Sequence, residues 1–276
     1  VVCFLQHLAS THRRSRPNRS PVSSWSALVA RAGLDVRRGI GADSRIGHSF
    51  LYAGCGYGGS CFPKDTQALV STAKAHGQSM KLVSATEQVN AQQKLLLVDR
   101  LMQRMGPDLT GRKIAVWGLS FKPNTDDMRE ATSRVVIRDL LMRGARVSAY
   151  DPVAGDEALR ALRIDCADHL DWLDRFELAS EDMQALQGAD ALMVLTEWKI
   201  FHNPDFEVMK DLMRRPFILD GRNLYNPEAL SEMGIAYQGV GRRNDLVQLL
   251  SFDAVPSSPP DLQDSHTSTP DMRVNA

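Results

Sequence analysis

The stretch KIAVWGLSFKPNTDDMREATSRVVIRDLLMRGARVSAYDP, at residues 113–152, decides the fold. Its apolar run at 113–119 predicts a buried strand, residues 133–142 predict a helix that Gly144 closes, and residues 147–150 predict a second strand. Later apolar runs at 191–195, 216–219 and 235–238 alternate with helix-like stretches at 181–187 and 226–233. This repeated order predicts an α/β protein with a parallel sheet and helices on both of its faces.

A helical segment precedes this sheet. The pattern predicts a short helix at 25–38, a Gly-rich loop at 39–61, a helix from Pro63 to residue 75 that Gly77 ends, and a long amphipathic helix at about 82–105. Candidates for the buried stripe of the long helix are Val83, Val89, Leu96, Leu97 and Leu101. We therefore divide the chain into a disordered leader (1–24), a central helical segment (25–110), a sheet domain (111–250) and a disordered tail (251–276).

Composition excludes several classes of protein. The 33 basic and 33 acidic residues give zero net charge, which favours neither nucleic-acid binding nor membrane-surface binding. No apolar run approaches the roughly 20 residues of a membrane span. The four cysteines are too few and too scattered for a disulfide framework, which predicts free thiols in a cytoplasmic protein.

The sharpest chemical motif is GCGYGGSCFPKD at residues 54–65. Its glycines lead Cys61 to the start of a helix, where free backbone N–H groups and the helix dipole favour a nucleophilic thiolate. Lys64 adds positive charge, and Asp65 is an acceptor that could hold a water molecule. Two interpretations remain open at this point, a catalytic cysteine and a small residue buried at a helix start.

Two other interpretations of this loop are weaker. Gly54, Gly56 and Gly59 match the spacing of the dinucleotide fingerprint, but no strand precedes them and no acidic residue follows at the required distance. Cys55 and Cys61 could form a redox pair, whereas their spacing is not that of a zinc site. We predict no metal site.

Ligands of parallel sheets bind beyond the carboxyl ends of the strands. Lys122 and Arg129 follow the first strand and precede a helix, where they could pair with phosphate oxygens. A polar loop with a capping acid explains the same residues equally well. Arg222 follows the strand end at Asp220 and could reach a phosphate or a sugar hydroxyl.

Seven motifs in this order resemble the UDP-glucose dehydrogenases of the UDP-glucose/GDP-mannose dehydrogenase family. They are RIG (45–47), FLY (50–52), GYGGSCFPKD (56–65), WGLSFKPNTDDMRE (117–130), TEW (196–198), NPDF (203–206) and LDGRN (219–223). The resemblance covers about residues 33–242. The SCFPKD ending of the cysteine loop favours UDP-glucose over related nucleotide sugars.

The resemblance implies that residues 111–250 form a Rossmann-like UDP-binding domain. It also implies a four-electron oxidation of UDP-glucose to UDP-glucuronate with NAD as cofactor. Cys61 would hold the sugar aldehyde as a thiohemiacetal and then carry a thioester, and Asp65 would help to orient the hydrolytic water.

The resemblance assigns the remaining site residues as well. The sugar nucleotide would be bound by Phe50, Leu51, Tyr52, Gly56, Lys122 and Arg222. Lys64 and Arg129 would contact NAD. Arg45 would reach across the interface of a homodimer formed through the helix at about 82–105.

The sequence also departs from the family pattern. The N-terminal NAD-binding domain of the family is not found in it, and residues 4–14, FLQHLASTHRR, lack the lysine and asparagine that precede the family's cysteine loop. A frame disruption upstream of about Trp25 is one hypothesis. We therefore expect the chain alone to be inactive. The alternative functions are a non-catalytic UDP-sugar-binding dimerisation module and a redox-sensing thiol protein that uses Cys55 and Cys61.

Overall fold

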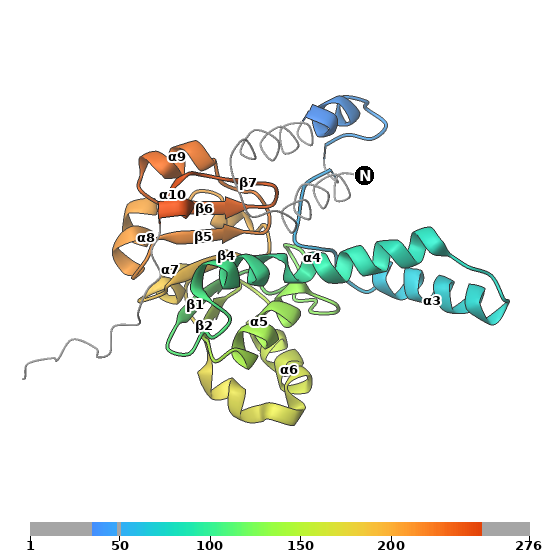
Figure 1. Cartoon of the computed structure of the whole chain (residues 1–276), viewed down its shortest axis with the longest axis horizontal. Coiled ribbons are helices and arrows are strands. Elements are labelled where there is room, and N and C mark those ends of the chain that lie inside the picture. Colours follow the sequence, from blue (N-terminus) through green and yellow to red (C-terminus); the bar gives the residue numbers. More distant parts are fainter. Residues whose placement is uncertain (1–34, 49–50, 250–276) are drawn as a thin grey trace, which may run out of the picture.

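The structure, a computed structural model, describes residues 35–48 and 51–249 (Figure 1). The predicted leader, the predicted tail, Phe50 and most of the helix predicted at 25–38 lie outside these ranges. Residues 35–41 are helical, so Gly39 and Gly41 belong to a helix and the predicted start of the loop at 39 is wrong.

A seven-stranded sheet in the order β3-β2-β1-β4-β5-β6-β7 forms the centre of the molecule. The six strands from β1 to β6 are parallel, and the short β7 is antiparallel to β6. The predicted α/β class with a parallel sheet is confirmed. The strands are β1 (Lys113–Trp117), β2 (Arg146–Tyr150), β3 (Phe176–Leu178), β4 (Ala191–Val194), β5 (Phe217–Asp220), β6 (Ala236–Gly239) and β7 (Arg242–Arg243).

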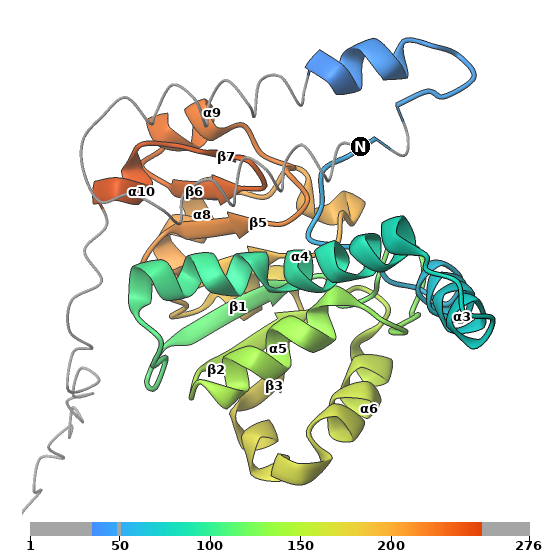
Figure 2. The same ribbon diagram turned by 45° about the vertical axis from the view of Figure 1, so that its right-hand side comes forward.

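Helices cover both faces of the sheet, as the sequence predicts (Figures 1 and 2). The first face packs against α4 (Lys81–Met105), α5 (Thr132–Met142), α6 (Gly155–Asp165) and α10 (Leu246–Leu249). The second face packs against α7 (Asp182–Leu186), η2 (Lys199–Phe201), α8 (Phe206–Leu212) and α9 (Pro227–Glu232), while η1 (Ala167–Arg175) joins α6 to β3.

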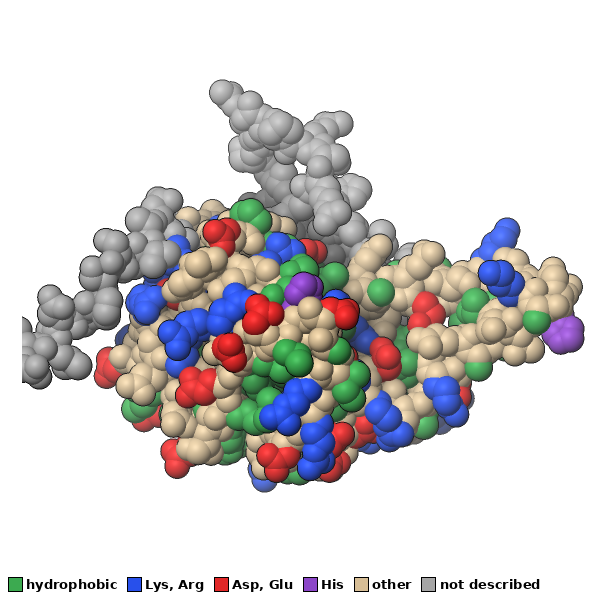
Figure 3. Space-filling model, turned by 90° about the horizontal axis from the view of Figure 1, so that it is seen from below, with side chains coloured by type: hydrophobic (Ala, Val, Ile, Leu, Met, Phe, Trp, Pro, Cys, Tyr) green, Lys and Arg blue, Asp and Glu red, His purple; other side chains and the backbone are tan. Residues whose placement is uncertain are grey.

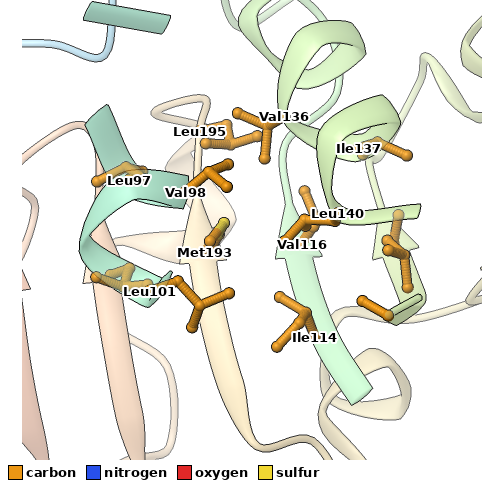
Figure 4. Packing of buried hydrophobic residues seen from close by; sticks show 14 of the residues in the cluster. Leu97, Val98, Leu101, Ile114, Val116, Val136, Ile137, Leu140, Met193 and Leu195 are labelled. Atoms are coloured by element: carbon orange, nitrogen blue, oxygen red, sulfur yellow. The ribbon is translucent and has the colours of Figure 1, made fainter. Parts of the chain in front are cut away.

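Alternation along each strand produces two apolar layers, because successive side chains point to opposite faces. Ile114 and Val116 of β1 contribute to the layer under α4 and α5, whereas Ala115 and Trp117 contribute to the other layer. Figure 4 shows the first layer, in which Val98 of α4 and Leu140 of α5 approach these strands. The sheet is thus buried on both faces.

α4 also pairs with α3 (Phe62–Ala75) in a helical hairpin that projects beyond the edge of the sheet (Figures 1 and 3). Leu97 and Leu101 are buried, as predicted, but Val83, Val89 and Leu96 are only half-buried. The prediction fails for these three residues. Val83 and Val89 belong to the half of α4 that precedes the buried stretch. No helix in the described ranges combines the length and the apolar character that crossing a membrane requires.

Candidate functional site

The loop that follows β1 contacts the loop that follows β4. Gly118, directly after β1, has a φ of +86°, and a Cβ there would lie 2.5 Å from the Thr196 side chain after β4. Thr196 Oγ1 in turn donates to the Ser120 carbonyl at 2.5 Å. These loops therefore touch at the switch point of the sheet, where parallel sheets bind ligands.

The cysteine loop, residues 54–61, lies on these strand ends. Cys55 is buried and its Sγ is 3.7 Å from the Leu195 carbonyl. Thr132 Oγ1, at the start of α5, donates to the Cys55 carbonyl at 3.1 Å. A Cβ at Gly221, after β5, would lie 2.8 Å from Cys55 Sγ, so only glycine lets the two segments approach this closely.

Polar side chains of α4 hold the other side of the loop. Asn90 accepts from the Tyr57 N–H at 2.8 Å and donates to the Tyr57 carbonyl at 3.1 Å. Gln93 Nε2 donates to the Gly54 carbonyl at 2.8 Å. Asn90, Gln93 and Lys94 are buried on α4, at spacings of three and four residues that put them on one face of a helix. These positioning residues were not predicted, although their spacing is the sequence signal that could have identified them.

The loop also runs against the backbone of the β1–α5 loop. Gly59 N donates to the Arg129 carbonyl at 2.8 Å, and a Cβ at Gly58 would lie only 2.3 Å from the Glu130 carbonyl oxygen. Glu130 has a φ of +52°, which is rare outside glycine, and its carbonyl and carboxylate both accept from Lys94 Nζ, at 3.0 and 3.1 Å. Two loops that are distant in sequence are thereby fixed to each other.

Cys61 is exposed at the N-terminus of α3, as the Gly-rich loop and Pro63 predict. Ser60 Oγ lies 3.7 Å from its Sγ. Lys64 and Asp65 occupy the first turn and form an exposed ion pair at 3.3 Å. The structure thus presents a free thiol to solvent, with a cation and a carboxylate one turn away.

Arg129 is the cation that the β1–α5 loop brings toward this thiol. Asp127 accepts from Arg129 Nε and Nη2 at 2.9 and 2.6 Å, which raises the pKa of Arg129, and Cys61 adds a smaller effect of the same sign. The same pair lowers the pKa of Asp127. Lys122, on the same loop, is exposed with its Nζ 5.3 Å from the centre of the Phe121 ring.

Arg222 approaches the cysteine loop from the end of β5. Its Nη1 lies 2.8 Å from the point where a Cβ at Gly54 would sit, and its Nε is 2.6 Å from Glu197 Oε2. Asp220 orders the segment by accepting from the Arg222 and Leu224 N–H groups at 2.8 and 2.7 Å. Burial raises the pKa of Asp220.

The remaining predicted site residues are Arg45, Leu51, Tyr52 and Gly56. Arg45 is 86% exposed and pairs with Asp43 at 2.5 Å. Tyr52 is exposed, with the Arg37 guanidinium 4.1 Å from its ring centre. Leu51 is half-buried. Gly56 lies within the loop at a φ of +97°, where a Cβ would be 3.0 Å from Asn90 Oδ1. Among the described side chains, no three His, Cys, Asp or Glu residues gather as a metal site.

Comparison with known families gives two matches. The UDP binding domain of the UDP-glucose/GDP-mannose dehydrogenase family matches residues 115–227, and the central domain of the same family matches residues 22–92.

Individual proteins of this family are also similar to the chain. A UDP-glucose 6-dehydrogenase of Pseudomonas aeruginosa is 46% identical over 226 residues, which are 80% of this chain and 48% of that protein. UDP-glucose 6-dehydrogenase TuaD of Bacillus subtilis is 41% identical over 80% of this chain and 46% of its own length. The solved UDP-glucose dehydrogenase of Pyrobaculum islandicum superposes with a TM-score of 0.63 at 31% identity, over 87% of this chain and 49% of that one.

The chain spans about half the length of the curated relatives that it matches. Both matched domain models come from one family, and the curated relatives at 40–46% identity carry one name. The chain belongs to the UDP-glucose/GDP-mannose dehydrogenase family.

Proposed function

We propose that this chain supplies the sugar-nucleotide site and the cysteine nucleophile of a UDP-glucose 6-dehydrogenase. One observation carries the proposal: the cysteine loop is docked on the carboxyl ends of β1, β4 and β5. That docking groups Arg222 with the loop glycines and Arg129 with the exposed Cys61 thiol. The names of the relatives supply the substrate, UDP-glucose.

The proposed sugar-nucleotide site consists of cationic side chains and of backbone that lacks a side chain at Gly56. Lys122 and Arg222 would pair with the diphosphate, because guanidinium and ammonium groups at strand ends bind phosphate oxygens well. Gly56 would let a ligand approach the loop backbone closely. Phe50, Leu51 and Tyr52 would contact the nucleotide from the segment that leads into the loop.

The proposed chemistry centres on Cys61. A first loss of hydride would convert the C6 alcohol of the sugar to an aldehyde. The exposed Sγ of Cys61 would add to this aldehyde to give a thiohemiacetal, and loss of a second hydride would convert the adduct to a thioester. Asp65, in the first turn of α3, would help to orient the water that releases UDP-glucuronate. NAD⁺, when bound, would accept the hydrides. Lys64 and Arg129 are exposed cations that fit its pyrophosphate, since each lies beside the Cys61 end of α3.

We also propose that the chain forms a homodimer through α4, the helix predicted at about 82–105, which pairs with α3 in the projecting hairpin. Leu82 is 86% exposed at the start of α4, and Phe62 and Leu69 of α3 are exposed as well. Contact with a partner would remove these exposed apolar side chains from water. In such a dimer Arg45 would reach the partner's site.

Binding is tested first. We would titrate UDP into the purified chain by calorimetry, for the wild type and for Cys61→Ser. Both should bind UDP equally, because the thiol does not contact the nucleotide in this proposal. A wild-type chain that is folded but binds no UDP would contradict the proposed site.

Turnover is tested next, as NADH formation at 340 nm from UDP-glucose and NAD⁺. We expect none from residues 1–276 alone. Fusion to the N-terminal half of the Pseudomonas aeruginosa relative should give NADH, and Cys61→Ser in the fusion should abolish it. Activity of the wild-type chain alone would disprove the expected inactivity, but its loss in Cys61→Ser would still identify the nucleophile. UDP binding without activity in the fusion would favour a non-catalytic UDP-sugar-binding module.

A further inference from the structure

Asp151 stands directly after β2, the second strand of the sheet. The order β3-β2-β1-β4-β5-β6 is the strand order of the dinucleotide-binding fold, in which an acidic residue beyond the glycine turn binds a ribose hydroxyl. Asp151 is the acidic residue that follows the strand–helix–strand unit of this domain, so it would have to supply the ribose contact.

The first oxygen of Asp151 is directed into the protein. Oδ2 accepts from the Leu119 N–H at 2.7 Å, from the Ser120 N–H at 3.1 Å and from Trp198 Nε1 at 3.0 Å. Ser120 Oγ lies 3.3 Å from the same oxygen. This one atom therefore joins the loop after β1 to the loop after β4.

The second oxygen of Asp151 holds its own loop. Oδ1 accepts from the Val153 and Ala154 N–H groups at 3.0 and 2.8 Å. Asp151 is only 8% exposed, and its carboxylate has about four lone-pair sites for these donors. No acceptor capacity is left for a ribose hydroxyl, because contacts within the protein occupy both oxygens.

We infer that Asp151 is a positioning residue, which fixes the sugar-nucleotide site at the switch point and closes the position where a dinucleotide would bind to this sheet. The inference rests on the proposed function. Two short paths connect Asp151 to the proposed phosphate ligands. In the first, Ser120 Oγ donates to the Lys122 carbonyl at 2.9 Å. In the second, Glu197, the residue directly before Trp198, is the ion-pair partner of Arg222.

The test uses variants of the whole chain. Asp151→Asn keeps the size of the side chain but turns an NH₂ group toward backbone donors. Trp198→Phe removes the indole hydrogen bond and also some of the ring volume that Trp198 buries in the core, so its thermal melt is read beside its affinity. Asp156→Asn, an exposed position on α6, is the matched control for loss of a carboxylate. Ile137→Val, at a buried position of α5, is a control for loss of stability.

Dissociation constants for UDP and for ADP-ribose would be measured by calorimetry, with thermal melts for every variant. Wild type should bind UDP at least 100-fold more tightly than ADP-ribose. Asp151→Asn should weaken UDP binding at least tenfold and Trp198→Phe at least threefold, while both controls should stay within twofold of wild type.

Each outcome decides the inference. Asp151→Asn that folds and binds UDP as Ile137→Val does would overturn it. If Asp151→Asn does not fold, Trp198→Phe decides in the same way. A wild-type chain that binds ADP-ribose as tightly as UDP would overturn the claim of a closed dinucleotide position. If wild type binds no UDP, both the proposed function and this inference, which depends on it, are wrong.

Discussion

Replacing Gly58 with alanine should separate the cysteine loop from the sheet domain. The new Cβ would lie 2.3 Å from the Glu130 oxygen, 2.8 Å from the Glu130 carbonyl carbon and 3.2 Å from the Ala131 nitrogen. Carbon and oxygen in contact need about 3.3 Å. The two backbones must therefore move apart by about 1 Å, because no flexible side chain is present that could yield instead.

The cost follows from two terms. Overpacking of this kind costs about 1–3 kcal/mol. The displacement also breaks the bond from Gly59 N to the Arg129 carbonyl, which contributes about 0.5–1.5 kcal/mol. Together these terms should lower the free energy of unfolding by about 1.5–4.5 kcal/mol. If the loop detaches and avoids the strain, the loss should appear in UDP affinity, because Arg222 then loses the loop that it faces.

The assay is urea unfolding followed by far-UV circular dichroism, with a UDP titration of the folded variant. Gly39→Ala is the control, since nothing lies within 4 Å of its added Cβ and the residue is helical. That control should be neutral or slightly more stable. Unchanged unfolding and unchanged UDP affinity in Gly58→Ala would refute the docking of the two loops.

Lys94→Met should lower the free energy of unfolding by about 1–3 kcal/mol, because it removes two bonds of a buried ammonium, and equal urea midpoints would contradict this. Iodoacetamide on the native chain should label Cys61 well before Cys55, because burial raises the pKa of the Cys55 thiol. Labelling would be followed by peptide mass spectrometry, and the reverse order would contradict the prediction. Arg129 lowers the pKa of Asp127, so their pair stabilises the fold above the ordinary carboxyl pKa of 3.8 and is lost as the pH falls through the lowered value. Arg129→Gln should raise that pKa in an NMR titration, and an unmoved titration curve would exclude the effect.

The sequence predicted those parts of the fold that have a strong local pattern. β1, β4 and β5 are largely apolar runs because they are buried on both faces. β2 and β6 also contain polar residues, but each was predicted from its place in the alternation of strands and helices. β3 has three residues and is only partly buried, so its sequence has no clear period. Neither α6 nor α8 was predicted. The signal for α6 was present, since Ala158, Ala161 and Leu162 are buried at helical spacing, whereas α8 has seven residues and one buried side chain. Division into domains and the roles of the site residues stay predictions.

The candidate site was predictable only where one segment carries it. The position of Cys61 follows from its own loop and Pro63, which are adjacent in sequence. Burial of Cys55 was not predictable, because it depends on Leu195 and Gly221, far along the chain. That burial opposes the redox-pair alternative, since a desolvated thiol with a raised pKa is a poor nucleophile.

α4 explains how an exposed cysteine can keep a fixed position. One half of its buried face is apolar, and Leu97 and Leu101 join the core under β1 and β4. The preceding turns bury Asn90 and Gln93, which bond the backbone of the cysteine loop. A helix is rigid over these few turns, so the loop is held in register with the sheet that presents Arg222. Asn90 and Gln93 interrupt the predicted apolar stripe of α4, and the same two residues fix the cysteine loop, and with it Cys61, relative to the sheet.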